Sequence, residues 1–147
     1  MSPYTAKIKR VRHYENKQKE NQMEYSDSLK KNNEFQRVYR KGTSQANRYL
    51  VMYVLENHDR HMENRLGISV SKKVGNSVVR HRLTRLIRES YRLNEAEFEN
   101  SLDIVVVARP QAKDRTYYEI ESALMHLAGK HCIAGKNNDK EVSDQNN

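Results

Sequence analysis

The stretch RLGISVSKKVGNSVVRHRLTRLIRESYR, residues Arg65 to Arg92, decides the fold of this 147-residue chain. Its first part alternates between polar and apolar side chains, which predicts a strand with one buried face and one open, polar face. The apolar positions are Leu66, Ile68 and Val70. From about Ser77 to Arg92 the apolar residues recur at helical spacing instead. The stretch therefore predicts a strand that leads through a short loop into a helix.

Basic residues dominate this helix, whose single acid is Glu89. At about 100° per residue, one side of the helix carries the apolar residues Val79, Leu83, Leu86 and Ile87. The opposite side carries His81, Arg85, Arg88 and Arg92, and the borders of the apolar stripe carry Arg80 and Arg82. Helices that only face water usually interleave acids with bases. The pattern therefore favours a phosphate-binding face over a merely solvated basic face.

The loop before the helix adds positive charge to the same surface. Lys72 and Lys73 precede Gly75, and Asn76 or Ser77 is suited to cap the helix. The first N–H groups of a helix carry partial positive charge, so lysines beside them form an anion site. Loop and helix together predict one continuous basic surface.

The other elements follow from shorter patterns. We expect a short helix in NNEFQRVYRKG (32–42), capped by Asn32 or Asn33 and ended by Gly42. We also expect strands at 48–56 and 103–109 and a closing helix at 116–131. The order α-β-β-α-β-α predicts an α+β fold, a two-layer sandwich whose small central sheet has helices on one face, with room for one additional short strand.

Composition divides the chain into three parts. Residues 1–28 are charged and amide-rich and predict a disordered basic arm, residues 29–133 predict one domain, and residues 134–147 predict a disordered polar tail. With 36% hydrophobic residues, the core is modest. The formal net charge of +8 favours a polyanionic partner, whether RNA, DNA or an acidic membrane surface, over a merely basic protein without one.

The sequence predicts neither a membrane segment nor a metal site. The single cysteine, Cys132, excludes an internal disulfide, no apolar run is long enough to span a bilayer, and no secretory signal is present, so we expect the cytoplasm. We find no paired acids, no nucleophile motif and no glycine-rich phosphate loop. His58 and His61 have no further ligands at metal-binding spacing, and His126, His131 and Cys132 are interpreted as the end of a helix.

Several motifs together resemble one known family. The segment RLGISVSKKVGNSVVRHRLTRLIRES is similar to the signature of the protein subunit of bacterial ribonuclease P: a strand ending S-V-S-K-K, a G-N turn and a helix opening R-N-R-x-K-R. The resemblance extends through LKKNNEFQRVYRKGTSQANRYLVMYV and DIVVVARPQA and covers residues 29–127. Two positions depart from the pattern, His81 in place of the usual Asn and Thr84 in place of the usual Lys.

The resemblance implies a small basic protein that binds a large catalytic RNA and assists the removal of the 5′ leader from precursor tRNA. It also implies that the chemistry belongs to the RNA and its magnesium ions, with no cofactor bound by the protein and no membrane or DNA partner. The residues that it places on the catalytic RNA are Lys72, Lys73, Asn76, Arg80, His81, Arg82, Arg85, Arg88 and Arg92.

The resemblance further implies a cleft for the single-stranded leader, on the open face of the sheet. Its residues are Phe35, Tyr39, Tyr53, Ser69 and Ser71. Stacking on aromatic rings beside a cationic groove is how proteins hold unpaired RNA. Phe35 and Tyr39 share a helix face, and Tyr53 points away from Met52 and Val54. Ordinary core packing remains the alternative for Phe35 and Tyr39.

Two other functions compete with this interpretation. A helix-turn-helix DNA binder would need a helix just before the arginine-rich helix, where the sequence predicts a strand. A ribosomal protein or ribosome-assembly factor of similar α+β build agrees equally well with the composition. Only the family-like motifs and the aromatic residues favour ribonuclease P over it.

Overall fold

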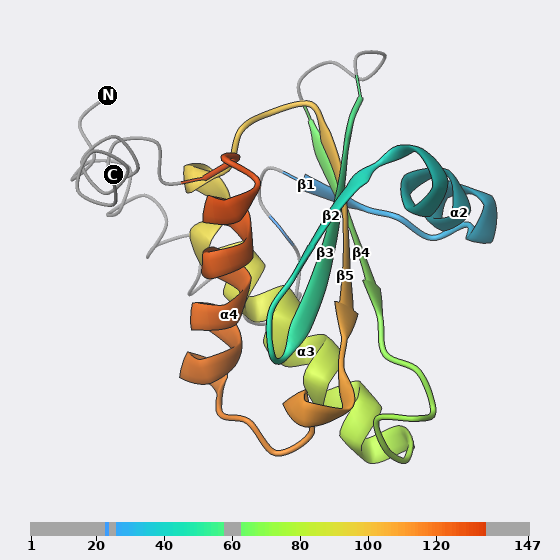
Figure 1. Ribbon diagram of the computed structural model, residues 1–147, viewed down its shortest axis with the longest axis vertical. Helices are drawn as coiled ribbons and strands as arrows, with labels where there is room; N and C mark the ends of the chain where they lie inside the picture. The colour runs from blue at the N-terminus through green and yellow to red at the C-terminus, as the bar shows by residue number, and fades with distance from the viewer. Residues whose placement is uncertain (1–22, 24–25, 58–62, 135–147) are drawn as a thin grey trace.

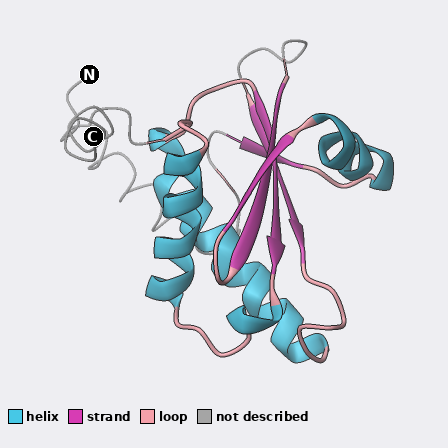
Figure 2. Cartoon of the chain, in the orientation of Figure 1, coloured by secondary structure: helices cyan, strands magenta, loops and turns pink. Residues whose placement is uncertain are grey.

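The computed structural model describes residues 23, 26–57 and 63–134. Within them, five strands form one sheet in the order β1-β4-β5-β3-β2 (Figure 1). The strands are β1 (Ser26–Ser28), β2 (Thr43–Ala46), β3 (Leu50–Glu56), β4 (Asn64–Ser69) and β5 (Leu102–Ala108). The helices are α2 (Asn32–Lys41), α3 (Ser77–Asn94) and α4 (Tyr117–Lys130), with short 3₁₀ turns at Glu95–Glu97 and Pro110–Ala112 (Figure 2). The predicted α+β class and the series α-β-β-α-β-α are confirmed, with two short strands added to the series rather than one.

The sheet is mixed. β5 lies at its centre, parallel to β4 and antiparallel to β3, while β1 pairs parallel with β4 at one edge and β2 pairs antiparallel with β3 at the other. The β3–β5 register sets Met52 opposite Val106 and Tyr53 opposite Val105. Because side chains alternate along a strand, these two pairs lie on opposite faces of the sheet.

The main core lies between the sheet and the helices α3 and α4. Leu83 and Ile87 of α3 are fully buried there, as are Ile120, Leu124 and Leu127 of α4. The apolar stripe that the sequence predicts on α3 is therefore confirmed. The predicted start of α3 is confirmed as well, since Asn76 Oδ1 accepts a hydrogen bond of 3.0 Å from the backbone N–H of Val79.

The second face of the sheet carries α2, which Figure 1 shows on the side opposite α3 and α4. Val38 of α2 is fully buried against Val105 of β5 in a smaller apolar cluster. The prediction of helices on one face only is thus incomplete. Its physical reason lies in β5, where consecutive valines present apolar side chains to both faces, so both faces need cover.

Two glycines allow α2 to lie this close to the sheet. A Cβ at Gly42 would stand 2.6 Å from the carbonyl oxygen of Val38 and 2.8 Å from that of Val54, so only glycine fits at the end of α2. A Cβ at Gly67 would stand 2.7 Å from the ring of Phe35. The helix ends at Gly42 as predicted, but its N-cap is Lys31 rather than Asn32 or Asn33, because the Glu34 carboxylate accepts the Lys31 N–H at 3.2 Å.

The described domain is slightly longer than predicted at both ends. β1, Ser26–Ser28, lies within the segment predicted as a disordered arm; it pairs with β4, and Ser26 Oγ lies 2.7 Å from the Tyr91 hydroxyl. At the other end, Ala134 is buried and forms a β-bridge with Phe98. Met23, also from the predicted arm, packs against the main core, and the remainder of the predicted arm and tail lies outside the described residues. Among the helices described, none is both long and apolar enough to cross a membrane.

Candidate nucleic-acid interface

The first part of the candidate interface is the basic surface of α3. His81, Arg82 and Arg85 are exposed, and Arg80 and Arg88 are half-buried; these five residues are called the arginine face below. Lys72 and Lys73 are exposed in the turn before the helix, which the buried side chain of Val74 anchors to the core. Apart from the buried Arg92, the predicted loop and helix residues are therefore at least partly open to solvent.

Arg92 does not belong to that exposed set. Its residue is 6% exposed, and its guanidinium forms an ion pair with Glu89, three residues earlier. Helical spacing alone places Arg92 near Arg85 and Arg88, so the sequence predicts it to be open. A long side chain can turn along the helix toward an acid, and the single acid of α3 stands at the right spacing. The expected exposure of Arg92 is therefore wrong for this structure.

Arg82 and Thr84 of α3 also use their polar groups within the protein. Arg82 donates to the backbone carbonyls of Arg115, at 2.8 Å, and Lys113, at 3.4 Å. It thereby connects α3 to the loop before α4 while remaining exposed. Thr84, which stands where the family pattern has lysine, donates its hydroxyl to the Arg80 carbonyl at 2.9 Å. Thr84 is half-buried, and its hydroxyl is used in a hydrogen bond within its own helix. His81, in contrast, is open to solvent.

The second part of the candidate interface is an aromatic cluster on the opposite face of the sheet. The ring centroids of Phe35 and Tyr39 are 6.4 Å apart, and those of Tyr39 and Tyr53 are 4.9 Å apart, edge to face. All three residues are half-buried and are called the aromatic face below. Tyr53 points away from Met52 and Val54, as predicted. Phe35 also packs over Gly67, so it serves the small second core as well.

Two serines extend the aromatic face along β4. Ser69 is half-buried and follows Gly67 by two residues, so its side chain lies on the same face of the sheet as the Phe35 ring. Ser71 lies just past the end of β4 and is exposed, next to Lys72. This loop leads from the aromatic face to the arginine face.

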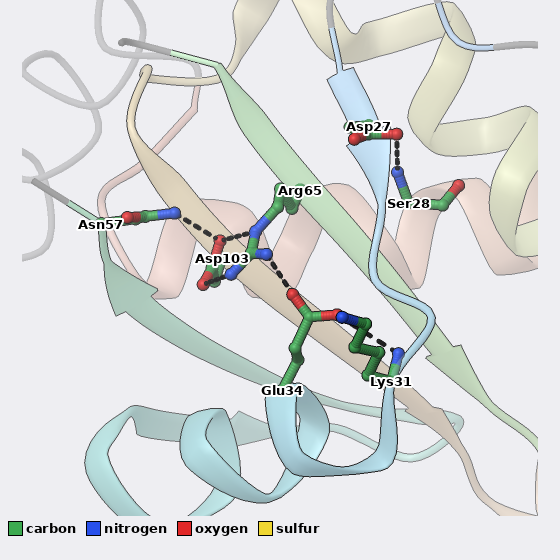
Figure 3. Close-up of polar contacts among 7 residues, drawn as sticks. All are labelled: Asp27, Ser28, Lys31, Glu34, Asn57, Arg65 and Asp103. Atoms are coloured by element: carbon green, nitrogen blue, oxygen red, sulfur yellow. Dashed lines mark hydrogen bonds and ion pairs between the residues drawn. The ribbon is translucent and has the colours of Figure 1, made fainter. Parts of the chain in front are cut away.

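A buried ionic cluster, missed by sequence reasoning, holds α2 against the sheet (Figure 3). Arg65 Nε and Nη2 donate to the two carboxylate oxygens of Asp103 at 2.9 and 2.6 Å, and Nη1 donates to Glu34 on α2. Asn57 Nδ2 donates to Asp103 Oδ1 at 3.0 Å. Arg65, Asp103, Glu34 and Asn57 are called the Arg65 network. Its only sequence signal is that Arg65 and Asp103 are charged residues within strands.

The protonation states in the Arg65 network follow from its contacts. The hydrogen bonds to Asp103 outweigh burial and raise the pKa of Arg65. Burial alone would raise the pKa of Glu34, but the Lys31 N–H and the Arg65 guanidinium outweigh it, so the pKa of Glu34 is lowered. Both side chains are therefore charged at neutral pH, and the first turn of α2 is ionically fastened to β4 and β5.

His126 and His131 lie near polar groups of the protein, whereas Cys132 is exposed. His131 Nε2 lies 2.9 Å from the Met52 carbonyl, His126 Nδ1 lies 3.3 Å from Asn47 Nδ2, and Cys132 is exposed. Across residues 26–57 and 63–134, the His, Cys, Asp and Glu side chains form no group of three or more that could hold a metal ion. The expectation for His58 and His61 lies outside the described residues.

Comparisons with known proteins agree with this geometry. A family model described as Ribonuclease P matches residues 23–132. The ribonuclease P protein component of Lachnoclostridium phytofermentans is 62% identical over 108 residues, covering 74% of this chain and 91% of that protein. The ribonuclease P protein component of Alkaliphilus metalliredigens is 55% identical over 108 residues, covering 74% of this chain and 96% of that protein.

Solved structures share the fold. The Staphylococcus aureus RNase P protein matches with a TM-score of 0.69 and 41% identity, over 75% of this chain and 99% of that chain. The RNase P protein from Thermotoga maritima matches with a TM-score of 0.63 and 28% identity, over 69% of this chain and 94% of that chain. Because the family model spans most of the sequence, and because both curated relatives are identical at more than half of their aligned positions, the chain belongs to the ribonuclease P protein family.

Proposed function

We propose that the chain acts as the protein subunit of a ribonuclease P ribonucleoprotein, which removes the 5′ leader from precursor tRNA. One observation carries the proposal. The molecule has two RNA-compatible surfaces on opposite sides of one sheet, and a basic loop at Lys72 and Lys73 joins them. Two separate surfaces suit a protein that contacts two RNA molecules at once.

The arginine face is the proposed contact for the catalytic RNA. Its residues, together with Lys72, Lys73 and the capping residue Asn76, offer cations and helix N–H groups to phosphates. Arg82 contributes while it also braces the loop before α4. Arg92 is left out of the proposed contact, because its guanidinium is buried and paired with Glu89.

The aromatic face is the proposed contact for the leader. Tyr39 and Tyr53 offer half-exposed rings to unpaired bases, and Ser69 and Ser71 offer hydroxyls beside them. Phe35 supports these rings by packing over Gly67. The Arg65 network fixes the position of α2, and with it the position of Phe35 and Tyr39 relative to the sheet.

The cleavage chemistry is proposed to reside in the RNA subunit and its magnesium ions. The protein would supply positive charge, which reduces the repulsion between two RNA molecules and lowers the magnesium concentration that they need. With this role we expect the protein in the cytoplasm, where transcripts are processed.

Reconstitution tests the proposal. The protein is mixed with a bacterial ribonuclease P RNA at a magnesium concentration too low for the RNA alone, and cleavage of precursor tRNA is followed over time. We expect a clear gain in cleavage rate, at the site that produces the mature 5′ end. The absence of any gain across a range of protein concentrations would refute the proposed function.

A further inference from the structure

A second aromatic and cationic surface lies at the start of α4 and is lined by residues that belong to neither face described above. A hollow of about 410 Å³ separates the first half of α4 from the turn between β2 and β3. Residues that line it include Asn47, Arg48, Tyr49, Tyr118, Ala123 and His126. We call this surface the α4 hollow.

Tyr118 is the most unusual residue of the α4 hollow. It is 78% exposed, and the other large apolar residue with comparable exposure among the described residues is Val78. Its ring stands edge to face with Tyr117 at a centroid distance of 5.5 Å, and the Tyr117 hydroxyl donates to Glu121 at 2.8 Å. Tyr117 is thus held in place by Glu121 and supports Tyr118. The Tyr118 ring itself is open to a partner.

Cations surround the second ring of the α4 hollow. The guanidinium carbons of Arg115 and Arg48 lie 5.4 and 6.0 Å from the centroid of the half-buried Tyr49 ring, within the range of cation–π attraction. Glu119 is the acid that lines the hollow, and its carboxylate already accepts the Thr116 N–H at 3.1 Å and lies 3.3 Å from Arg115. The charge left for a partner is therefore positive.

Hydrogen bonds fix the shape of the α4 hollow before any partner binds. Asn47 Oδ1 accepts from the N–H groups of Tyr49 at 3.2 Å and Leu50 at 3.0 Å, while its Nδ2 donates to the Ala123 carbonyl of α4 at 2.9 Å. Arg109 donates to the Asn47 carbonyl at 2.9 Å. The turn that carries Arg48 and Tyr49 is therefore tied to α4 through Asn47 and to the end of β5 through Arg109. A preformed site loses little entropy when it binds.

The α4 hollow is also connected to the arginine face. Arg82 donates to the carbonyl of Arg115, and Arg115 stands over the Tyr49 ring. The arginine face and the α4 hollow are therefore joined through Arg115. An apolar peptide partner would fit poorly, since it would bury the charges of Arg48 and Arg115.

We propose that the α4 hollow binds one unpaired nucleotide of an RNA, with the base stacked on Tyr118 and the phosphate next to Arg48 and Arg115. Exposed aromatic rings beside guanidinium groups are the usual means of holding a single unpaired base. The inference rests on the proposed function, because it assumes that α3 already holds RNA. It adds a third contact, separate from the arginine face and the aromatic face.

The test compares Tyr118→Leu with Tyr118→Phe, which keeps the stacking ring. Two arms identify the source of the nucleotide: affinity for the catalytic RNA alone, and affinity of the assembled holoenzyme for precursor tRNA. We expect Tyr118→Leu to weaken binding about fivefold or more in one arm, and Tyr118→Phe to stay within about twofold of wild type. The arm that responds assigns the nucleotide to the catalytic RNA or to the substrate.

Failure of the inference can be separated from failure of the proposed function. Arg85→Glu serves as a variant of the arginine face in the same experiments. If Arg85→Glu weakens binding and Tyr118→Leu does not in either arm, the α4 hollow does not bind RNA. If both Tyr118 variants lose affinity equally, stacking is not the interaction, which also overturns the inference. If the wild-type protein binds neither RNA, the proposed function and this inference fail together.

Discussion

Arginine is used in two opposite ways in this molecule, on α3 and on β4. The arginine face of α3 holds its guanidinium groups at or near the surface, and Arg85 has solvent around it. Arg65 of β4 is 5% exposed and is held by Asp103 and Glu34. The same side chain is therefore a free cation in one place and a structural connector in the other. The comparison shows that the position of an arginine in the fold decides whether its guanidinium is accessible to RNA.

Each environment has its own energetic consequence. Exposed cations interact with a polyanion at long range and are screened by salt, so they affect affinity and its salt dependence. A buried pair has already lost its hydration, and breaking it leaves an uncompensated charge in the interior. Substitutions on α3 should therefore affect binding, and substitutions in the Arg65 network should affect folding.

The largest expected effect is on folding stability, and it comes from replacing an arginine with methionine once in each environment. Arg65→Met leaves Asp103, which is 1% exposed, without its main partner, and we expect a loss of about 3–5 kcal/mol in the free energy of unfolding. Arg85→Met removes an exposed side chain, and we expect a change within about 0.5 kcal/mol. Urea unfolding of the two variants at pH 7 measures the difference. Equal effects on stability would contradict the comparison.

A double variant sharpens the interpretation of the Arg65 result. Replacing Arg65 with Met and Asp103 with Leu together removes both buried charges instead of one. Apolar replacements for a buried ion pair are often neutral or stabilising. We expect the double variant to recover part of the stability lost in Arg65→Met. If the double variant recovers no stability, the hydrogen bonds of Arg65 and Asp103 to Glu34 and Asn57 stabilise the fold in addition to the charge balance within the pair.

The second effect concerns affinity rather than folding. We expect Arg85→Glu combined with Arg88→Glu to weaken binding to the catalytic RNA. The slope of log affinity against log salt should fall by about 0.7–0.9 for each phosphate that the variant no longer neutralises. The fold should remain, since neither residue belongs to the buried core. Filter binding at several salt concentrations measures both the affinity and the slope. Arg92→Gln is a matched comparison from the same helix, and it should leave the slope unchanged, because Arg92 is buried.

The third effect separates the aromatic face from the arginine face. We expect Tyr39→Leu or Tyr53→Leu to lower the holoenzyme's affinity for precursor tRNA by about 1–3 kcal/mol at most, since each removes one stacking ring. The loss should vanish for mature tRNA, which has no leader. Affinity for the catalytic RNA should stay constant. An equal loss for both tRNAs, with the circular dichroism spectrum unchanged, would make these tyrosines scaffold residues.

Local patterns were sufficient to predict most of the fold. The apolar stripe of α3, the cap at Asn76 and the alternation along β3 are properties of neighbouring residues, and the structure has them as predicted. The aromatic face could also be predicted, because helix spacing and strand alternation fix the directions of Tyr39 and Tyr53. The resemblance to the family supplied the meaning of these patterns.

What the sequence could not predict depends on long-range pairing. Arg65 meets Asp103 only because β4 and β5 are neighbours, and Glu34 joins them only because α2 lies on the second face of the sheet. β1 has the sequence SDS, which carries no strand signal, and it is a strand because the edge of β4 offers backbone partners. The α4 hollow combines a turn and a helix that are far apart in the chain.

The smallest expected effect is a pH dependence that starts at Glu34. The pKa of Glu34 in the folded protein lies below its ordinary value of 4.5, so near that value the unfolded chain binds more protons than the folded one. The stabilisation is therefore complete above about pH 5 and is lost as the pH falls through the lower, folded pKa. Glu34→Gln removes this contribution at neutral pH. The variant should be less stable than wild type by on the order of 1 kcal/mol at pH 7, because the pair with Arg65 is partly exposed to solvent.

The pH dependence of the unfolding free energy tests whether Glu34 stabilises the protein through its charge or only through the helix propensity of residue 34. The difference in unfolding free energy between wild type and Glu34→Gln should shrink as the pH falls from 5 through the lowered, folded pKa of Glu34, since the wild-type carboxylate then takes up a proton. Urea unfolding at several pH values gives this curve, and Glu97→Gln, at an exposed glutamate outside the Arg65 network, is the control. A difference that stays constant down to pH 3 would show that the charge of Glu34 contributes to stability neither through Arg65 nor through the Lys31 N–H. In that case the charge of Arg65 would be balanced by Asp103, and the connection between α2 and the sheet would rest on the packing of Phe35 and Val38.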